Sequence, residues 1–402
     1  MDYPQVKQAA PVLTSLVQQS TGQSVITPTT PGEFYSVATT AQRVDYDILT
    51  NTINQMWSET VFSVRPYDQK FTSLEKDLKK WGNMMRKISI AASDPINDPA
   101  FMWPVIYDKT NHPDNALGNG ESVDMYKISK PDLLQTNFYG RAVYGWRRTF
   151  FREQWDVALS SAEEFNRLND MFMIDRANNL ATYKENVARG LLANAIASIL
   201  DEGQTTRVFH VVTEYNTATG SNLTEQTALA PDNYAAVIRW FYSQMKTIAQ
   251  RFAERTQMYQ TVINNKPVLR HTSPDRLKAA FYAPAVNMME SMALSTTFHD
   301  DYLKTVEFTP VTFWQSIETP DSISITPVYT DTTGAQKTGE AKEQAHIFGI
   351  MYDEDAMGYS VVNNWSATSP FNIDGGYWNI ADHADFKSLF DMTEKMVVFI
   401  FD

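Results

Sequence analysis

The chain has 402 residues, of which 43% are apolar, and its 34 lysine and arginine residues against 47 aspartate and glutamate residues give a formal net charge of −13. This composition suits a folded protein with one large core or two to three domains, and it excludes a wholly disordered chain. The absence of cysteine excludes disulfides, thiolate nucleophiles and zinc–thiolate sites. The net negative charge makes it unfavourable for the protein as a whole to bind DNA or an anionic membrane.

The N-terminal third reads as an arm, a helix and an extended projection. Residues 1–33 are rich in Gln, Ser, Thr and Pro, which predicts a flexible arm whose scattered apolar residues lie along a neighbour. A helix is predicted over about 35–60, where apolar residues recur near helical spacing. From about 61 to 151 prolines and a turn-rich stretch (111–122) separate extended pieces, and 138–151 predict a strand. Loops of this length without regular structure are uncommon inside a compact domain. We therefore expect this segment to project from the molecule and to be covered when another molecule docks on it.

The strongest local signal is the proline-free stretch 160–203. Ser160 and Ser161 each stand three residues before a glutamate, which is the capping-box pattern, and Gly203 can end the helix. At about 1.5 Å per residue this helix would reach roughly 60 Å if unbroken. We therefore expect a spine, with Gly190 or Asn178–Asn179 as the points where it would bend.

The remainder predicts a mixture of helices and strands. We expect a strand over 207–215, an amphipathic helix from Pro231, and a strand, turn and helix over 265–294 with Ser273 as the N-cap and Pro274 as the first helical residue. From Val306 onward the pattern is mostly strands, ending in the apolar run 396–401, which is too short to span a membrane. The predicted fold class is α+β.

Residues 351–379 pose the question of an active site, because they combine three early carboxylates with a later Asp-Gly-Gly. A calcium loop starting at Asp353 would place Met357 and Asn364 where oxygen ligands are needed, so the EF-hand pattern fails. Asp353 and Asp355 would suit a glycosidase, but no second acidic motif pairs with them. We read 373–379 as a tight turn in which Gly375 and Gly376 take positive φ.

Histidines and basic segments give no catalytic pattern either. No HExxH is present and no two histidines lie one helical turn apart, so we expect no metal site and no cofactor, and we expect His346 to be a core histidine in an apolar strand. The basic segments 76–87 and 145–152 are either a solvated face or docking surfaces for the acidic surface of another copy. We take as candidate inter-subunit contacts Phe34, Tyr35, Lys79, Lys80, Trp81, Arg86, Arg147, Arg148 and Arg152.

Three stretches resemble the major capsid proteins of tailed double-stranded DNA bacteriophages, and of these most of all the small phi-29-like or picovirus-type podophages. The stretches are 267–291 (PVLRHTSPDRLKAAFYAPAVNMMES), 308–316 (FTPVTFWQS) and 347–379 (IFGIMYDEDAMGYSVVNNWSATSPFNIDGGYWN). The resemblance implies the HK-97 fold and a structural role without enzymatic activity. It also implies this division of the chain: an N-terminal arm and first helix (1–60), an E-loop with flanking strands (61–151), a peripheral domain with the spine helix at about 161–200 (152–224), an axial domain (225–320), and C-terminal strands shared between the two domains (321–402).

The same resemblance implies the partners. Subunits would self-assemble into hexamers and pentamers of an icosahedral shell in the virion, built in the bacterial host cytoplasm with a separate scaffolding protein and a portal protein at one vertex. The shell would enclose double-stranded DNA by proximity, without sequence recognition, and no membrane is involved. Two other functions stay open at this point: an acidic, aromatic-rich carbohydrate-active enzyme or lectin, and another phage structural protein such as a tail or portal component.

Overall fold

The computed structural model describes residues 4–21, 27–42, 69–76, 84–91, 125–126, 128, 130, 132–159, 161–266, 268–294 and 307–402. Several expectations lie outside these residues: the predicted helix beyond residue 42, the turn-rich stretch 111–122, and the candidate contacts Lys79, Lys80 and Trp81.

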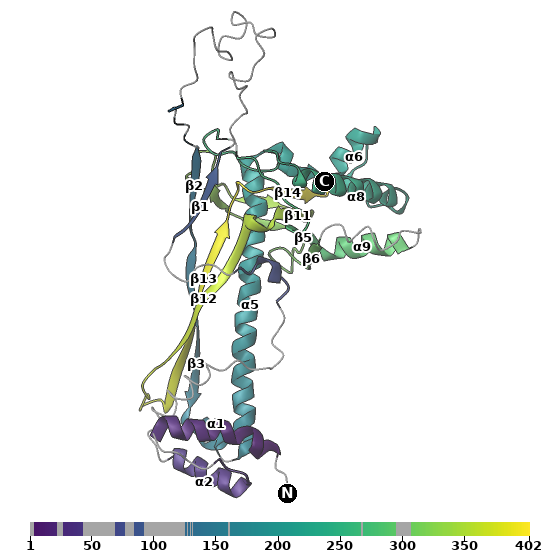
Figure 1. Ribbon diagram of the computed structural model, residues 1–402. Helices are drawn as coiled ribbons and strands as arrows, with labels where there is room; N and C mark the ends of the chain where they lie inside the picture. The colour runs from purple at the N-terminus through teal and green to yellow at the C-terminus, as the bar shows by residue number, and fades with distance from the viewer. Residues whose placement is uncertain are drawn as a thin grey trace, which may run out of the picture.

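Helix α5 (Ala162–Glu202) connects the two ends of the molecule (Figure 1). The Ser161 side chain accepts a hydrogen bond from the backbone N–H of Glu164 at 3.2 Å. At the other end Gly203 takes φ 71° and donates its N–H to the carbonyl of Ile199, a left-handed cap that favours glycine. The predicted long helix is confirmed, and it continues through Gly190 as a single element.

A three-stranded antiparallel sheet lies along α5. Its strands β3 (Arg141–Phe151), β12 (Met357–Thr368) and β13 (Tyr377–Phe390) are ordered β12-β13-β3. The Tyr183 ring on α5 packs on this sheet, with ring centroids 4.3 Å from Tyr144 and 5.9 Å from Phe386. The turn between β12 and β13 is present, and Gly376 takes positive φ as predicted. Gly375 does not take positive φ; it is needed because a Cβ there would collide with the Tyr377 ring.

A five-stranded mixed sheet forms the other end of the molecule, in the order β4-β14-β11-β5-β6. Its strands are β4 (Val208–His210), β14 (Met396–Ile400), β11 (Ile347–Asp353), β5 (Leu277–Tyr282) and β6 (Glu307–Val311). Alternate residues of β11 and β14 enter two cores, because Ile350 and Val398 pack with α5 while Met351 and Val397 pack with α8 (Pro231–Ala253). Burial on both faces explains why both strands read as continuous apolar runs.

The N-terminal segment is helical, contrary to the expected flexible arm. Helix α1 (Pro4–Thr21) packs beside α2 (Pro31–Gln42) at the start of α5 (Figure 1). The buried residues Val6, Ala9, Leu13 and Val17 recur at spacings of three to four, so they form one helical face. They join Phe34, Phe165 and Trp378 in a terminal cluster that is separate from the two central cores.

A β-hairpin lies beyond the three-stranded sheet. Strands β1 (Met84–Ile90) and β2 (Leu133–Tyr139) pair antiparallel from Met84 opposite Tyr139 to Ile90 opposite Leu133. The shorter elements are η1 (Thr72–Leu74), α4 (Arg152–Ala158), η3 (Thr205–Arg207), α6 (Val211–Thr219), α7 (Glu225–Ala228), α9 (Ala283–Leu294), β7 (Ile323–Ile325), β8 (Val328–Thr330), β9 (Gln336–Thr338), β10 (Lys342–Gln344) and η5 (Glu354–Ala356).

Three local predictions are wrong. The strand expected over 207–215 stops at His210, where pairing with β14 ends, and the chain continues as α6. Ser273 does not cap a helix: its carbonyl accepts from the N–H groups of Arg276 and Leu277 in a turn, and pairing with β11 then draws the next residues into β5. His346 is not a core residue, because its side chain is 48% exposed at a bend with φ 58° before β11.

Candidate functional site

The carboxylates after β11 have structural partners. Asp353 is buried, and its side chain accepts hydrogen bonds from the Thr272 hydroxyl at 2.6 Å and from the backbone N–H of Asp355 at 2.8 Å. Burial acts to raise the pKa of Asp355, but the hydrogen bond from Arg276 and the charge of Lys76 hold it below its ordinary value. These acids therefore serve as a cap and an ion-pair partner of the η5 turn.

The later Asp374 lies at the far end of the β12–β13 hairpin from Asp353. Strand β12 alone runs from Met357 to Thr368 between them, which is roughly 35 Å at the rise of a β-strand. Paired glycosidase carboxylates lie about 5–10 Å apart. The two acidic motifs therefore cannot act on one glycosidic bond within a single chain.

Within the described ranges, no group of three or more His, Asp or Glu side chains could hold a metal ion. None of the helices described there is both long enough and apolar enough to cross a membrane.

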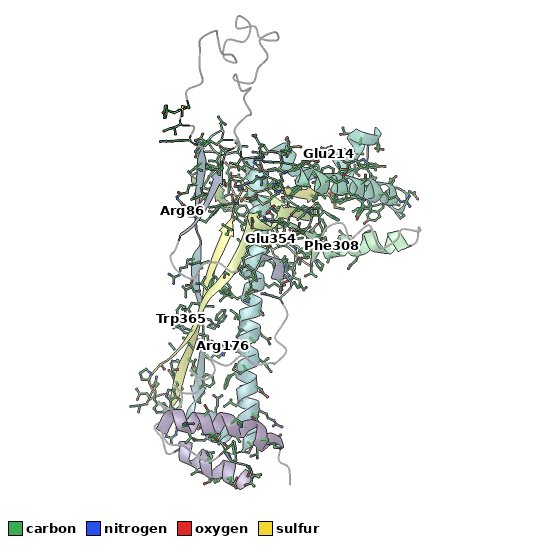
Figure 2. The ribbon with its side chains drawn as sticks, viewed as in Figure 1. Arg86, Arg176, Glu214, Phe308, Glu354 and Trp365 are labelled. Atoms are coloured by element: carbon green, nitrogen blue, oxygen red, sulfur yellow. The ribbon has the colours of Figure 1, made fainter. Side chains whose placement is uncertain are left out.

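The predicted contact residues are spread over three regions. Arg86 lies on the exposed face of β1 (Figure 2), and Arg147 and Arg152 are exposed on β3 and at the start of α4. Tyr35 on α2 is 60% exposed, whereas its neighbour Phe34 is 1% exposed and packs edge-on against Phe165 at 6.4 Å.

Arg148 is engaged inside the chain, since its guanidinium lies 2.9 Å from Asp175 and 3.4 Å from Asp382. This ion pair fixes β3 and β13 to α5. Arg148 therefore mainly stabilises the fold, whereas Arg86 and Arg147 have no ion pair among the residues that the structure describes.

The outward face of the β1–β2 hairpin is an apolar surface that the sequence reading did not single out. Register places Ile88, Ile90 and Leu133 on the same face as Arg86. Ile88, Ile90 and Leu133 are 59%, 66% and 53% exposed. We call these three residues the hairpin face. Part of it could have been predicted from the sequence, because side chains alternate along a strand and this alternation places Arg86, Ile88 and Ile90 on one side.

The opposite face of the hairpin is anchored by buried charges. Lys87 pairs with Asp391 at 2.6 Å and with Glu394, both of which are buried. Burial acts to lower the pKa of Lys87, but the two carboxylates outweigh it and the pKa ends above its ordinary value. Arg270 adds a hydrogen bond to the Ser89 hydroxyl at 2.8 Å. The hairpin face is therefore exposed on a stem held firmly from behind.

A second set of exposed apolar residues lies at the α1–α2 end. Val157 on α4 is 60% exposed, and Ile373 in the β12–β13 turn is 85% exposed. The two segments are joined by a hydrogen bond of 3.0 Å from the Arg152 N–H to the Gly376 carbonyl. Exposed apolar residues at both ends of an elongated molecule are typical of a protein that contacts other subunits.

Comparison with known proteins decides the family. The sequence model of the family described as Phi29-like phage major capsid protein matches residues 17–399. The chain belongs to this family.

Solved structures agree on the fold of this capsid protein. A chain from the capsid structure of Staphylococcus phage Andhra superposes with a TM-score of 0.52 at 8% identity, covering 86% of this chain and 87% of that one. A chain from the structure of head fibre and inner core protein gp22 of native bacteriophage P68 gives a TM-score of 0.52 at 10% identity over the same shares of the two chains. No curated protein sequence matches the chain.

The α+β class and the HK-97 capsid fold are confirmed, and the chain is a structural major capsid protein of a bacteriophage virion. Its family implies a structural, non-enzymatic role, which agrees with the structural use of Asp353 and Asp355.

Proposed function

We propose that this capsid protein assembles into hexamers and pentamers of an icosahedral shell that encloses double-stranded DNA. The observation that carries the proposal is the hairpin face: three exposed apolar side chains on a stem that Lys87 and Arg270 anchor from behind. Such a face loses unfavourable contact with water when a neighbouring subunit covers it. The net charge of −13 supports enclosure of DNA by proximity, because an acidic protein does not bind phosphates tightly.

The proposed division of the chain remains the one expected from the sequence. It comprises an arm and first helix (1–60), an E-loop with flanking strands (61–151), a peripheral domain (152–224), an axial domain (225–320) and shared C-terminal strands (321–402). In its support, β1 and β2 fall within the proposed E-loop segment, α5 within the peripheral domain, and α8 within the axial domain.

We assign the inter-subunit contacts first to the exposed residues Tyr35, Arg86, Arg147 and Arg152. Phe34 and Arg148 would support those contacts from beneath. The assignment of Lys79, Lys80 and Trp81 rests on the sequence alone. The acidic surface of a neighbouring copy would receive these basic side chains.

The further partners are a separate scaffolding protein, a portal protein at one vertex, and packaged DNA. Assembly would take place in the bacterial host cytoplasm. These partners follow from the family resemblance.

Negative-stain electron microscopy of the purified chain, alone and with its scaffolding protein, tests the assembly. Closed shells, or hexameric and pentameric rings, are the expected products. Tubes or a single ring type would instead indicate a tail or portal component, and a stable monomer at high concentration would overturn the proposal.

A matched pair of variants tests the hairpin face. Ile90→Asp introduces a charge where a neighbour should cover an apolar side chain, so we expect it to abolish closed shells while the thermal midpoint of the single chain stays unchanged. Asn222→Asp introduces the same charge at an exposed polar position away from the hairpin face and should still allow shells. Normal shells from Ile90→Asp would show that the hairpin face is not an assembly contact.

A further inference from the structure

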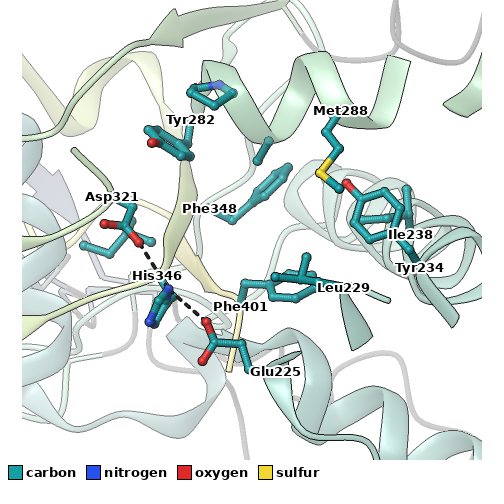
Figure 3. A pocket seen from close by; sticks show the side chains of 13 residues that line it. Glu225, Leu229, Tyr234, Ile238, Tyr282, Met288, Asp321, His346, Phe348 and Phe401 are labelled. Atoms are coloured by element: carbon teal, nitrogen blue, oxygen red, sulfur yellow. Dashed lines mark ion pairs between the residues drawn. The ribbon is translucent and has the colours of Figure 1, made fainter. Parts of the chain in front are cut away.

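A pocket of about 250 Å³ lies between α8, α9 and the ends of β5, β11 and β14 (Figure 3). Most of its lining is apolar, formed by Leu229, Ile238, Ala285, Met288, Phe348 and Phe401. Typical ligand pockets begin at about 300 Å³, so this one suits a small molecule and not a large cofactor.

Two carboxylates share one imidazole nitrogen at one end of the pocket. The Nδ1 atom of His346 lies 2.9 Å from Oε1 of Glu225 and 3.1 Å from Oδ2 of Asp321 (Figure 3). One nitrogen carries at most one proton, so two carboxylates compete for a single donor. The acceptor capacity and negative charge left over at this end complement a cationic group.

The position of His346 is fixed by its backbone. Its φ of 58° lies in the left-handed region, and its carbonyl accepts a hydrogen bond of 2.8 Å from the N–H of Phe401. The backbone of His346 is therefore fixed at the end of the C-terminal strand, and from there the imidazole reaches the two carboxylates.

Tyr234 brings a hydroxyl group to the opposite end of the pocket. It is 2% exposed, its hydroxyl points into the pocket (Figure 3), and no hydrogen bond for that hydroxyl is found among the residues that the structure describes. Burial raises the pKa of Tyr234 to about 12, so the phenol stays protonated and can donate. A bound molecule that reaches this end of the pocket can accept a hydrogen bond from the hydroxyl.

We propose that this pocket binds a small amphipathic ammonium ion. The ammonium group contacts the free oxygens of Glu225 and Asp321 beside His346, the apolar body contacts Phe348 and Met288, and an oxygen at the far end accepts a hydrogen bond from Tyr234. The site lies within one chain, so binding does not depend on assembly.

Tyramine is a suitable probe, because it has an ammonium group, an aromatic body and a hydroxyl at the far end. Ligand-observed NMR titration of the full chain should show tyramine binding at least about tenfold more tightly than 3-(4-hydroxyphenyl)propionate, whose carboxylate would meet Glu225 and Asp321. Equal binding of the two probes, or no binding of tyramine at millimolar concentration, would overturn the proposal.

Variants locate the binding. Glu225→Gln combined with Asp321→Asn should weaken tyramine binding by about tenfold, the scale of two partly exposed ion pairs, whereas the exposed Glu214→Gln should not change it. Ala285→Leu adds three carbons to the pocket wall and should abolish binding; Ala236→Leu adds the same bulk on an exposed side of α8 and should not. Tyramine binding that survives both pocket changes would assign it to another place on the chain.

Discussion

Lys395 is a buried lysine whose partners are mainly backbone carbonyls. Its Nζ donates to the carbonyl oxygens of Glu254 at 2.6 Å, Phe252 at 3.1 Å and Arg251 at 3.3 Å, where α8 ends. The last carbonyls of a helix have no partner within the helix and carry partial negative charge, so an ammonium there satisfies several acceptors at once. Burial nevertheless lowers the pKa of Lys395 to about 8, against the opposing effect of Asp353 and Glu254.

This lowered pKa predicts a pH dependence of stability. Below about pH 8 Lys395 is protonated in both states, whereas between about pH 8 and 10.5 the folded chain loses the proton and the unfolded chain keeps it. The unfolded state then binds more protons, so the contribution of Lys395 to the free energy of unfolding rises with pH over this range. From pH 7.5 to 10 the gain is about 2 kcal/mol.

Urea unfolding of the wild type and of Lys395→Met at both pH values measures that gain. The variant should be less stable at pH 7.5 by about 1–3 kcal/mol, because buried carbonyls lose their donor, and the difference between the two proteins should widen at pH 10. A difference that stays constant would show that Lys395 keeps its proton throughout.

Strand β11 shows how closely an element can be packed. At Gly349, in the middle of the five-stranded sheet, a Cβ would lie 2.6 Å from the carbonyl oxygen of Ala280 on the neighbouring strand. Gly190 on α5 is the opposite case, since a Cβ there meets nothing within 4 Å.

Two glycine-to-alanine variants should therefore have opposite effects. Gly349→Ala forces adjacent strands apart and should lower the free energy of unfolding by about 1–3 kcal/mol. Gly190→Ala removes backbone freedom from an exposed helix position and should raise it by about 0.5–1 kcal/mol. Denaturant midpoints measure both values, and a destabilised Gly190→Ala would mean that α5 needs the flexibility of glycine at this position.

Elements were predictable from the sequence where local signals and tertiary contacts agree. The cap residues Ser161 and Gly203 bound α5, and the continuous apolar runs of β11 and β14 report burial on both faces. Helix α1 was missed because its Gln-, Ser- and Thr-rich sequence has a narrow apolar face, which becomes visible only against α5. Strand β5 was misread because pairing with β11 outweighs the Ser-Pro-Asp signal for a helix.

The candidate surfaces were only partly predictable. Residue type pointed to Arg86 and Arg147, which are exposed, but it could not show that Phe34 is buried by α5 or that Arg148 is paired with Asp175. The hairpin face depends on the register between two strands that lie more than forty residues apart in the sequence. That register cannot be predicted from the local sequence of either strand.

At the scale of the whole molecule, the terminal cluster around α1 is separate from the cores at the other end of α5. Leu13 on α1 is fully buried in this cluster, whereas Gln18 on the same helix is exposed. Loss of the cluster should therefore loosen one end of the molecule without unfolding the other.

Hydrogen exchange with Leu13→Asp tests this separation. Backbone amides of 162–172 should exchange faster, because Phe165 loses its cover, while those of 188–199 should keep their protection. Gln18→Asp places the same charge on the solvent side of α1 and should leave both segments unchanged. Faster exchange over 188–199 would show that α5 unfolds as one unit from end to end.

The loop between β13 and β14 meets several parts of the molecule within five residues. Asp391 and Glu394 form ion pairs with Lys87 of the hairpin, and Lys395 donates a hydrogen bond to the Glu254 carbonyl at the end of α8. The same loop thus contacts both the hairpin and α8. The hairpin at the edge of the molecule and the helix α8 are therefore linked through one short segment, and a force applied to the hairpin is expected to displace α8.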